Sequence, residues 1–305
     1  MKIKTGAGRI VGICVLGALA GCAGTPKTDQ DTSANDALRN TNLDVMFATE
    51  FPVESQDEAL LKANNAYRAG EVDKALFFYV RALQFNTENV DLLALIGDIH
   101  FKRNDLVRAK RAYVRALSID SEHAETLEAL GLIHLSEGNE TEALNELARA
   151  TAIDDGRWRA HNALGVYLDR SGNYSAAQAH YNSALARNPG SGQVLNNRGY
   201  SKYLAGDIAG ATLDLHSAAS TRGFEMAWGN LGLVYASQGL YEDAISAYRE
   251  IMAEANVYNS VGQIAIDNGD LELAQIYLDE AVRLSPTYFP QAQRNLELLQ
   301  TLVRQ

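Results

Sequence analysis

The chain has 305 residues, with 27 lysines and arginines against 38 aspartates and glutamates, which gives a formal net charge of −11. This acidic balance argues against nonspecific binding to nucleic acid and against electrostatic docking of the whole molecule to anionic lipid. The only cysteines are Cys14 and Cys22. Beyond residue 22 the chain therefore cannot form an intrachain disulfide, a zinc site built on cysteine or a cysteine nucleophile.

Residues 1–21 have the layout of a secretory signal. Positive charges come first, at Lys2, Lys4 and Arg9, and an apolar run from Ile10 to Ala20 follows. The run is too short for a transmembrane helix, so a signal peptide is predicted. Since the leader has three cations and no acid, its removal would change the net charge from −11 to −14.

The end of the leader, Leu19-Ala20-Gly21-Cys22, resembles the lipobox of bacterial lipoproteins. The resemblance implies cleavage before Cys22, a diacylglycerol on its thiol and an acyl group on its amine. Two or more acyl chains anchor a protein stably to a membrane. The residue after Cys22 is Ala23 rather than an aspartate. By the sorting rule of that family, this implies the outer membrane, with the rest of the chain facing the periplasm. An ordinary signal peptide with an incidental cysteine is the alternative.

Residues 22–55 are predicted to be the lipidated cysteine and a flexible tether. From residue 24 onward they are rich in Thr, Asp, Asn, Gln and Ser and have no sustained helical period. Within the tether, Leu43–Phe51 is a more apolar stretch that is a candidate for packing on the first folded unit.

From residue 56 the sequence repeats. Small residues recur at intervals of 34, 34, 34, 34, 33 and 30 residues, at Ala63, Gly97, Gly131, Gly165, Gly199, Gly232 and Gly262. A turn residue follows each of them, at Gly70, Asn104, Gly138, Gly172, Gly206, Gly239 and Gly269. An alanine follows each turn, at Ala75, Ala109, Ala143, Ala177, Ala211, Ala244 and Ala274. Small residues in matching registers predict pairs of helices that approach closely.

Trp228, Leu231, Gly232 and Tyr235 fit the W-x2-L-G-x2-Y opening of the tetratricopeptide repeat (TPR). The chain resembles TPR proteins, which implies an all-α fold, a right-handed superhelix (α-solenoid) of about seven helix pairs. The predicted repeats are 56–89, 90–123, 124–157, 158–191, 192–224, 225–254 and 255–288, with a capping helix in 289–305. The first pair is expected near Asp57–Ala69 and Val72–Phe85, the cap near Pro290–Val303, and a shortened stretch between Ile251 and Val257.

The sequence contains no catalytic motif that we would defend. Its six histidines include no H-x3-H or H-E-x-x-H pair, and there is no P-loop, G-x-G-x-x-G or G-x-S-x-G. We therefore expect no enzymatic activity, metal, cofactor or small-molecule substrate.

The TPR resemblance implies a concave groove, lined mainly by the first helix of each repeat, that binds proteins or peptides. The repeat register places ten residues there: Asn64, Tyr67, Asp98, Phe101, Arg159, Asn162, Asn196, Tyr200, Tyr203 and Asn259. Asparagine can bond a peptide backbone, and tyrosine offers wide contact at low entropic cost. We favour binding for the group Asn162, Asn196, Tyr200 and Tyr203. Alternatively, these side chains solvate the groove or bridge neighbouring helices.

The last third of the chain is similar to the TadD-type TPR lipoprotein of tight-adherence (Flp) pilus assembly. The similarity lies in LNNRGYSKYLAGD at Leu195–Asp207, AWGNLGLVYASQG at Ala227–Gly239, ANVYNSVG at Ala255–Gly262 and LSPTYFPQAQRNL at Leu284–Leu296. It implies a lipoprotein that helps a pilus secretin to localise or assemble. Arg198 departs from the family's apolar residue before Gly199. The alternatives are a pilotin of type IV pili and an adaptor that scaffolds peptidoglycan hydrolases and proteases.

Overall fold

The structure is a computed structural model that describes residues 53–285 and 287–304. The predicted signal peptide, Cys22 and nearly all of the tether lie outside these residues. Within them the chain forms fifteen α-helices and no strand, which confirms the all-α prediction. None of the helices in this part of the chain has the length and apolar character that a membrane span requires.

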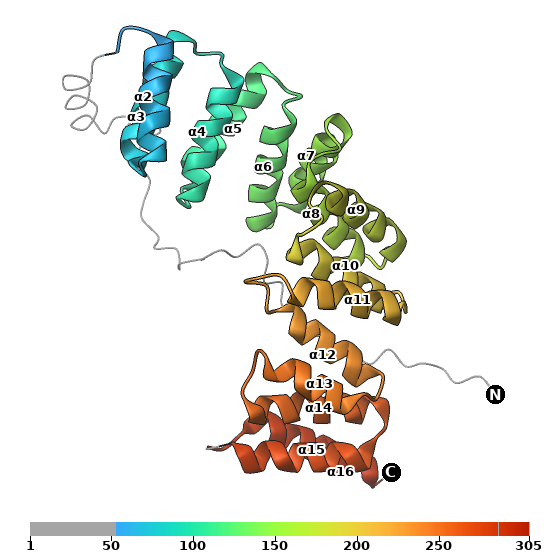
Figure 1. Ribbon diagram of the computed structural model, residues 1–305. Coiled ribbons are helices and arrows are strands. Elements are labelled where there is room, and N and C mark those ends of the chain that lie inside the picture. The colour runs from blue at the N-terminus through green and yellow to red at the C-terminus, as the bar shows by residue number, and fades with distance from the viewer. Residues whose placement is uncertain (1–52, 286, 305) are drawn as a thin grey trace. The chain divides into compact units, whose positions relative to one another are not determined.

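The chain divides after Ala150 into two compact units. The first unit contains α2 (Gln56–Arg68), α3 (Val72–Phe85), α4 (Val90–Lys102), α5 (Leu106–Ile119), α6 (Ala124–Ser136) and α7 (Glu140–Ile153), in whose last turn the division falls. The second unit contains α8 (Trp158–Arg170), α9 (Tyr174–Arg187), α10 (Gly192–Leu204), α11 (Ile208–Ala219), α12 (Ala227–Ser237), α13 (Tyr241–Arg249), α14 (Glu254–Asn268), α15 (Leu271–Leu284) and α16 (Pro290–Val303). Within each unit, helices that follow one another in the chain pack side by side (Figure 1).

Side chains cap the starts of seven of the fifteen described helices. Ser55 accepts a hydrogen bond from the amide of Glu58, Asn89 from that of Leu92, and Asp105 from that of Arg108. Such N-caps satisfy amides that have no partner inside the helix. Helix α2 therefore begins at Gln56, one residue before the predicted start, and α16 coincides with the predicted cap.

The predicted turn residues share one backbone conformation. All seven have positive φ, including Asn104 at 59° where the other turns have glycine. The left-handed region is open to glycine and is tolerated by asparagine, whereas other side chains clash there. The turn between the two helices of each pair therefore depends on these residue types.

The two helices of a pair meet at a small residue. A Cβ on Gly165 would lie 2.6 Å from Cε1 of Tyr181, and one on Gly232 would lie 2.7 Å from Cδ1 of Tyr248. At Gly131, Gly199 and Gly262 the facing residue is Leu147, Leu215 and Leu278, again sixteen positions later in the chain. The seven predicted second-helix alanines are all fully buried. The repeated small residues thus mark the contact between paired helices, as the sequence predicted.

The predicted shortening falls in α13. This helix has nine residues and ends at Arg249, and α14 begins at Glu254. Nε of Arg249 lies 2.8 Å from Oε1 of Glu254. An ion pair therefore spans the shortened junction.

Gly232→Leu tests the helix contact. The new side chain has to displace the Tyr248 ring or part the two helices, so we expect a loss of about 1–3 kcal/mol of unfolding free energy and a lower Tm. Gly190→Ala is the control, since nothing lies within 4 Å of the added Cβ there. An unchanged Tm for Gly232→Leu would contradict the assigned contact.

Candidate functional site

The predicted groove residues fall in both units. Asn64, Tyr67, Asp98 and Phe101 lie in the first, and Arg159, Asn162, Asn196, Tyr200, Tyr203 and Asn259 lie in the second.

In the first unit, two predicted groove residues hold buried tyrosines of the second helices. The hydroxyl of Tyr79 donates to Oδ1 of Asn64 at 2.7 Å, and that of Tyr113 donates to Oδ1 of Asp98 at 2.6 Å. Both rings are almost fully buried. Burial raises the pKa of Tyr113, and the hydrogen bond to Asp98 raises it further, so this hydroxyl stays protonated. Asn64 and Asp98 therefore bridge the two helices of their pairs, as the alternative in the sequence analysis allowed, although the sequence named no partner for them.

Tyr67 and Phe101 occupy the same register in the first two repeats, near the ends of α2 and α4. Phe101 is 43% exposed. The hydroxyl of Tyr67, which is half-buried, lies 3.4 Å from Nζ of Lys102. These two aromatic side chains thus lie at the surface of the first unit.

In the second unit, four asparagines form a hydrogen-bonded row that we call the amide ladder. Nδ2 of Asn197 donates to Oδ1 of Asn162 at 3.0 Å, Nδ2 of Asn196 to Oδ1 of Asn197 at 3.4 Å, and Nδ2 of Asn230 to Oδ1 of Asn196 at 2.7 Å. The row crosses from α8 through α10 to α12.

The ladder buries two of the predicted groove residues. Asn162 is 7% and Asn196 9% exposed, so both bridge neighbouring first helices, as the alternative reading allowed. Asn259 does the same, since it accepts a hydrogen bond from Asn295 of α16 at 3.0 Å. Sequence reasoning missed Asn197 and Asn230. A signal was present, because Asn162, Asn196 and Asn230 are spaced by 34 residues.

Tyr200 and Tyr203 lie together on α10. Their ring centroids are 6.1 Å apart, and both side chains are half-buried. Tyr203 also packs against the apolar cluster that contains Leu215 and Leu231. On α8, Arg159 is exposed, and its guanidinium carbon lies 4.8 Å from the centre of the Trp158 ring.

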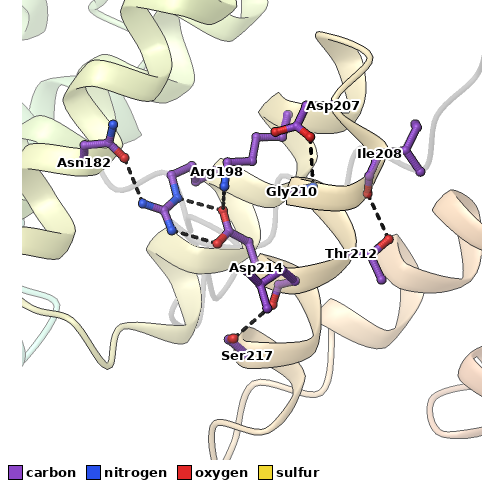
Figure 2. Close-up of polar contacts among 10 residues, drawn as sticks. Asn182, Arg198, Asp207, Ile208, Gly210, Thr212, Asp214 and Ser217 are labelled. Atoms are coloured by element: carbon purple, nitrogen blue, oxygen red, sulfur yellow. Dashed lines mark hydrogen bonds and ion pairs between the residues drawn. The ribbon is translucent and has the colours of Figure 1, made fainter.

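Arg198 is held by a buried ion pair on the side of α10 that faces α11. Its Nε and Nη2 donate to the two carboxylate oxygens of Asp214, each at 2.7 Å, and its Nη1 donates to Oδ1 of Asn182 at 2.8 Å (Figure 2). Nζ of Lys202 lies 2.8 Å from Oδ2 of Asp214. The polar residue at position 198 is therefore satisfied by partners on α9 and α11.

The Asp214 side chain is only 4% exposed. Burial alone would raise the pKa of this carboxyl, but the hydrogen bonds from Arg198 and Lys202 outweigh burial and hold the pKa below its ordinary value. Asp214 thus stays ionised at neutral pH and joins α11 to α10, the helix that carries Tyr200 and Tyr203.

His161 and His180 lie within hydrogen-bonding distance of each other and do not form a metal site. Nδ1 of His161 and Nδ1 of His180 are 2.9 Å apart, and Nε2 of His161 lies 3.1 Å from Oδ1 of Asp155. Burial and the neighbouring His161 lower the pKa of His180. Among the residues that the structure describes, no three histidine, cysteine or acidic side chains are grouped to hold a metal ion.

Asp214→Ala tests the ion pair. It leaves Arg198 and Lys202 without their shared carboxylate, so we expect a loss of about 3 kcal/mol of unfolding free energy at neutral pH. Because the folded-state pKa of Asp214 is lowered, its contribution is present above about pH 4 and is lost as the pH falls through the folded-state pKa. Denaturant titrations of both proteins at pH 7 and pH 3 measure this difference.

Asp279→Ala is the matched control, since Asp279 is exposed and, among the residues that the structure describes, bonds Gln275 alone. Equal stability of the unaltered chain and Asp214→Ala at pH 7 would contradict the role assigned to the pair.

Comparison with known proteins assigns the chain to a family. Tetratricopeptide-repeat models match residues 94–157, 162–223, 227–256 and 255–288, and none of them describes a catalytic family. The chain matches none of the curated proteins with which it was compared.

Solved structures share the fold at low sequence identity. A tetratricopeptide repeat protein from Parabacteroides merdae is 18% identical, with a TM-score of 0.52 over 80% of this chain and 98% of that one. The C-terminal part of a TPR protein from Cytophaga hutchinsonii is 13% identical, with a TM-score of 0.55 over 77% and 98%. A chain of the APC/C hetero-tetramer Cut9–Hcn1 is 19% identical, with a TM-score of 0.53 over 85% of this chain and 51% of that one.

The matched ranges cover more than half of the sequence, and the described helices pack as the repeat requires. TPR proteins are typically scaffolds that bind proteins or peptides. The chain belongs to the tetratricopeptide-repeat family.

Proposed function

We propose that this protein is a TPR scaffold held at the outer membrane by lipid on Cys22, and that it binds a protein partner in the periplasm through the surface around Tyr200 and Tyr203. The observation that carries the proposal is this tyrosine pair, half-buried and 6.1 Å apart on a helix fixed from two sides. The amide ladder joins α10 to α8 and α12, and the Arg198–Asp214 pair joins it to α11.

A fixed aromatic pair suits protein recognition. Tyrosine and other aromatic side chains dominate binding energy at interfaces, and a site that is ordered before binding loses less conformational entropy. The amides of Asn162 and Asn196 already bond other asparagines. We therefore assign contact with the partner to Tyr200 and Tyr203, and positioning of α10 to the ladder.

We propose a subunit of a pilus secretin as the partner, in a tight-adherence (Flp) pilus system. The support is the similarity of the segments within 195–298 to the TadD-type lipoprotein. The segment Leu195–Asp207 of that similarity covers most of α10 (Gly192–Leu204) and includes Tyr200 and Tyr203, so the tyrosine pair lies within it.

A crosslinked pull-down from native membranes tests the partner. Tyr200→Ala with Tyr203→Ala should reduce recovery of a secretin subunit at least tenfold, because about 1.4 kcal/mol of lost affinity changes binding tenfold. Tyr288→Ala is the matched control, since Tyr288 is 76% exposed and lies between α15 and α16. Equal recovery of the secretin subunit by the unaltered protein and both variants would support the secretin as partner but place its contact away from Tyr200 and Tyr203. Recovery of cell-wall hydrolases instead would contradict the pilus pathway.

Cys22→Ser tests the anchor. Without the thiol no diacylglycerol can be attached, so we expect the protein to be released from the outer membrane or mislocalised, while its helical circular dichroism and Tm stay unchanged. Fractionation followed by immunoblotting measures the change. Normal membrane recovery of Cys22→Ser would contradict lipid anchoring at this residue.

A further inference from the structure

The first unit carries a basic surface that the proposed function does not use. Between Lys102 and Arg115 the sequence has six lysines and arginines and a single acid, Asp105, although the chain as a whole is acidic. Helix α5 contains four of these cations and no acid. A helix of this composition attracts anionic groups.

Only some of these charges are already paired. Arg103 lies 2.6 Å from Asp73, Arg108 2.5 Å from Asp105, and Lys110 2.8 Å from Glu137. Arg111 and Arg115 are exposed and form no ion pair with any residue that the structure describes, although Nη1 of Arg115 lies 3.4 Å from Oγ of Ser118. Two positive charges on α5 thus lack a carboxylate.

Apolar side chains lie among these charges. One open hollow of about 650 Å³ is lined by Val107, Lys110, Arg111, Val114, Arg115 and Ser118. A second of about 240 Å³ is lined by Val80, Leu83, Gln84, Thr87, Leu93 and Arg115. Arg115 lines both, so they form one surface, which we call the α3–α5 surface. No acid lines it, and Val80, Val107 and Val114 are 44%, 62% and 57% exposed.

The chain supplies a segment of complementary chemistry just before the first described residue, Val53. Leu43–Phe51 reads LDVMFATEF, with two acids, Asp44 and Glu50, no cation and mostly apolar residues otherwise. It ends two positions before Val53, which is buried in the core of the first repeat, and Leu83 packs against that core. Since α2 and α3 are packed antiparallel across a short turn, the start of α2 lies at the same end as Gln84 and Thr87.

Length permits the contact. Nine extended residues span about 30 Å, whereas a 14-residue helix such as α5 is about 21 Å long. The segment is therefore long enough to follow the surface from the end of α3 along α5.

We propose that residues 43–51, which lie outside the described part of the chain, dock on the α3–α5 surface. Asp44 and Glu50 face Arg111 and Arg115, and the apolar side chains cover Val80, Val107 and Val114. With lipid on Cys22, docking leaves only residues 23–42 between the anchor and the repeats. The last part of the tether then sets how far the first repeat stands from the membrane.

Hydrogen exchange tests this docking on the chain from residue 22 onward, with Cys22→Ser. We expect the amides of residues 43–51 to exchange at least about tenfold more slowly than in the free peptide, as a docked population of nine-tenths or more requires. Arg111→Glu with Arg115→Glu should abolish this protection. Asp44→Lys with Glu50→Lys should do the same without altering any repeat.

The charge swap separates docking from damage to the fold. All four substitutions together should restore the protection, and Arg222→Glu with Arg294→Glu, which are exposed arginines of the second unit, should leave it unchanged. The proposal would be overturned if the amides of residues 43–51 in the unaltered chain exchanged as fast as in the free peptide. Protection that neither pair of substitutions affects would also overturn it. Protection that rises with protein concentration would also overturn it, in favour of contact with a second copy.

Discussion

The fold depends on one contact that recurs in each helix pair, between a small residue of the first helix and the ring or leucine side chain sixteen positions later. At Gly165 and Gly232 there is no room for even a Cβ against the facing tyrosine. A buried tyrosine ring places its hydroxyl in the interior, where it needs a hydrogen-bond partner. Asn64, Asp98 and Asp169 accept these bonds from Tyr79, Tyr113 and Tyr181. The packing contact thus decides what several polar residues of the first helices do.

Hydrogen bonds between buried polar side chains also determine which residues of the candidate binding surface stay available. Asn162, Asn196, Asn197 and Asn230 bond one another across three first helices, and the Arg198 guanidinium is satisfied by Asp214 and Asn182. These groups hold α10 in place. Tyr200 and Tyr203 remain at its surface as a positioned aromatic pair, which is the kind of group that carries binding energy in protein interfaces. In the proposed function, the polar groups position α10 and the tyrosine pair contacts the partner.

The sequence alone was sufficient for the fold, because the small residues, turn residues and alanines keep a common period, and each marks a contact or a positive φ in the structure. It was less informative about the surface. The register placed Asn64 and Asn162 on the groove side. It could not show that their side chains accept hydrogen bonds from Tyr79 and Asn197, since those bonds depend on distances between helices. The sequence showed Arg198 only as a departure from the family's apolar residue, because its partner Asp214 is brought close only by the pairing of α10 with α11. The role of Cys22 and the tether lies outside the described residues and stays a prediction.

The central claim is that a secretin subunit contacts the tyrosine pair on α10. Site-specific photocrosslinking in native membranes tests it most directly, with a photoreactive phenylalanine analogue placed at Tyr203 in one strain and at Tyr288 in another. The account predicts an adduct with a secretin subunit from position 203 and none from position 288. An adduct of equal yield from both positions, or an adduct from position 203 with a cell-wall hydrolase, would contradict it.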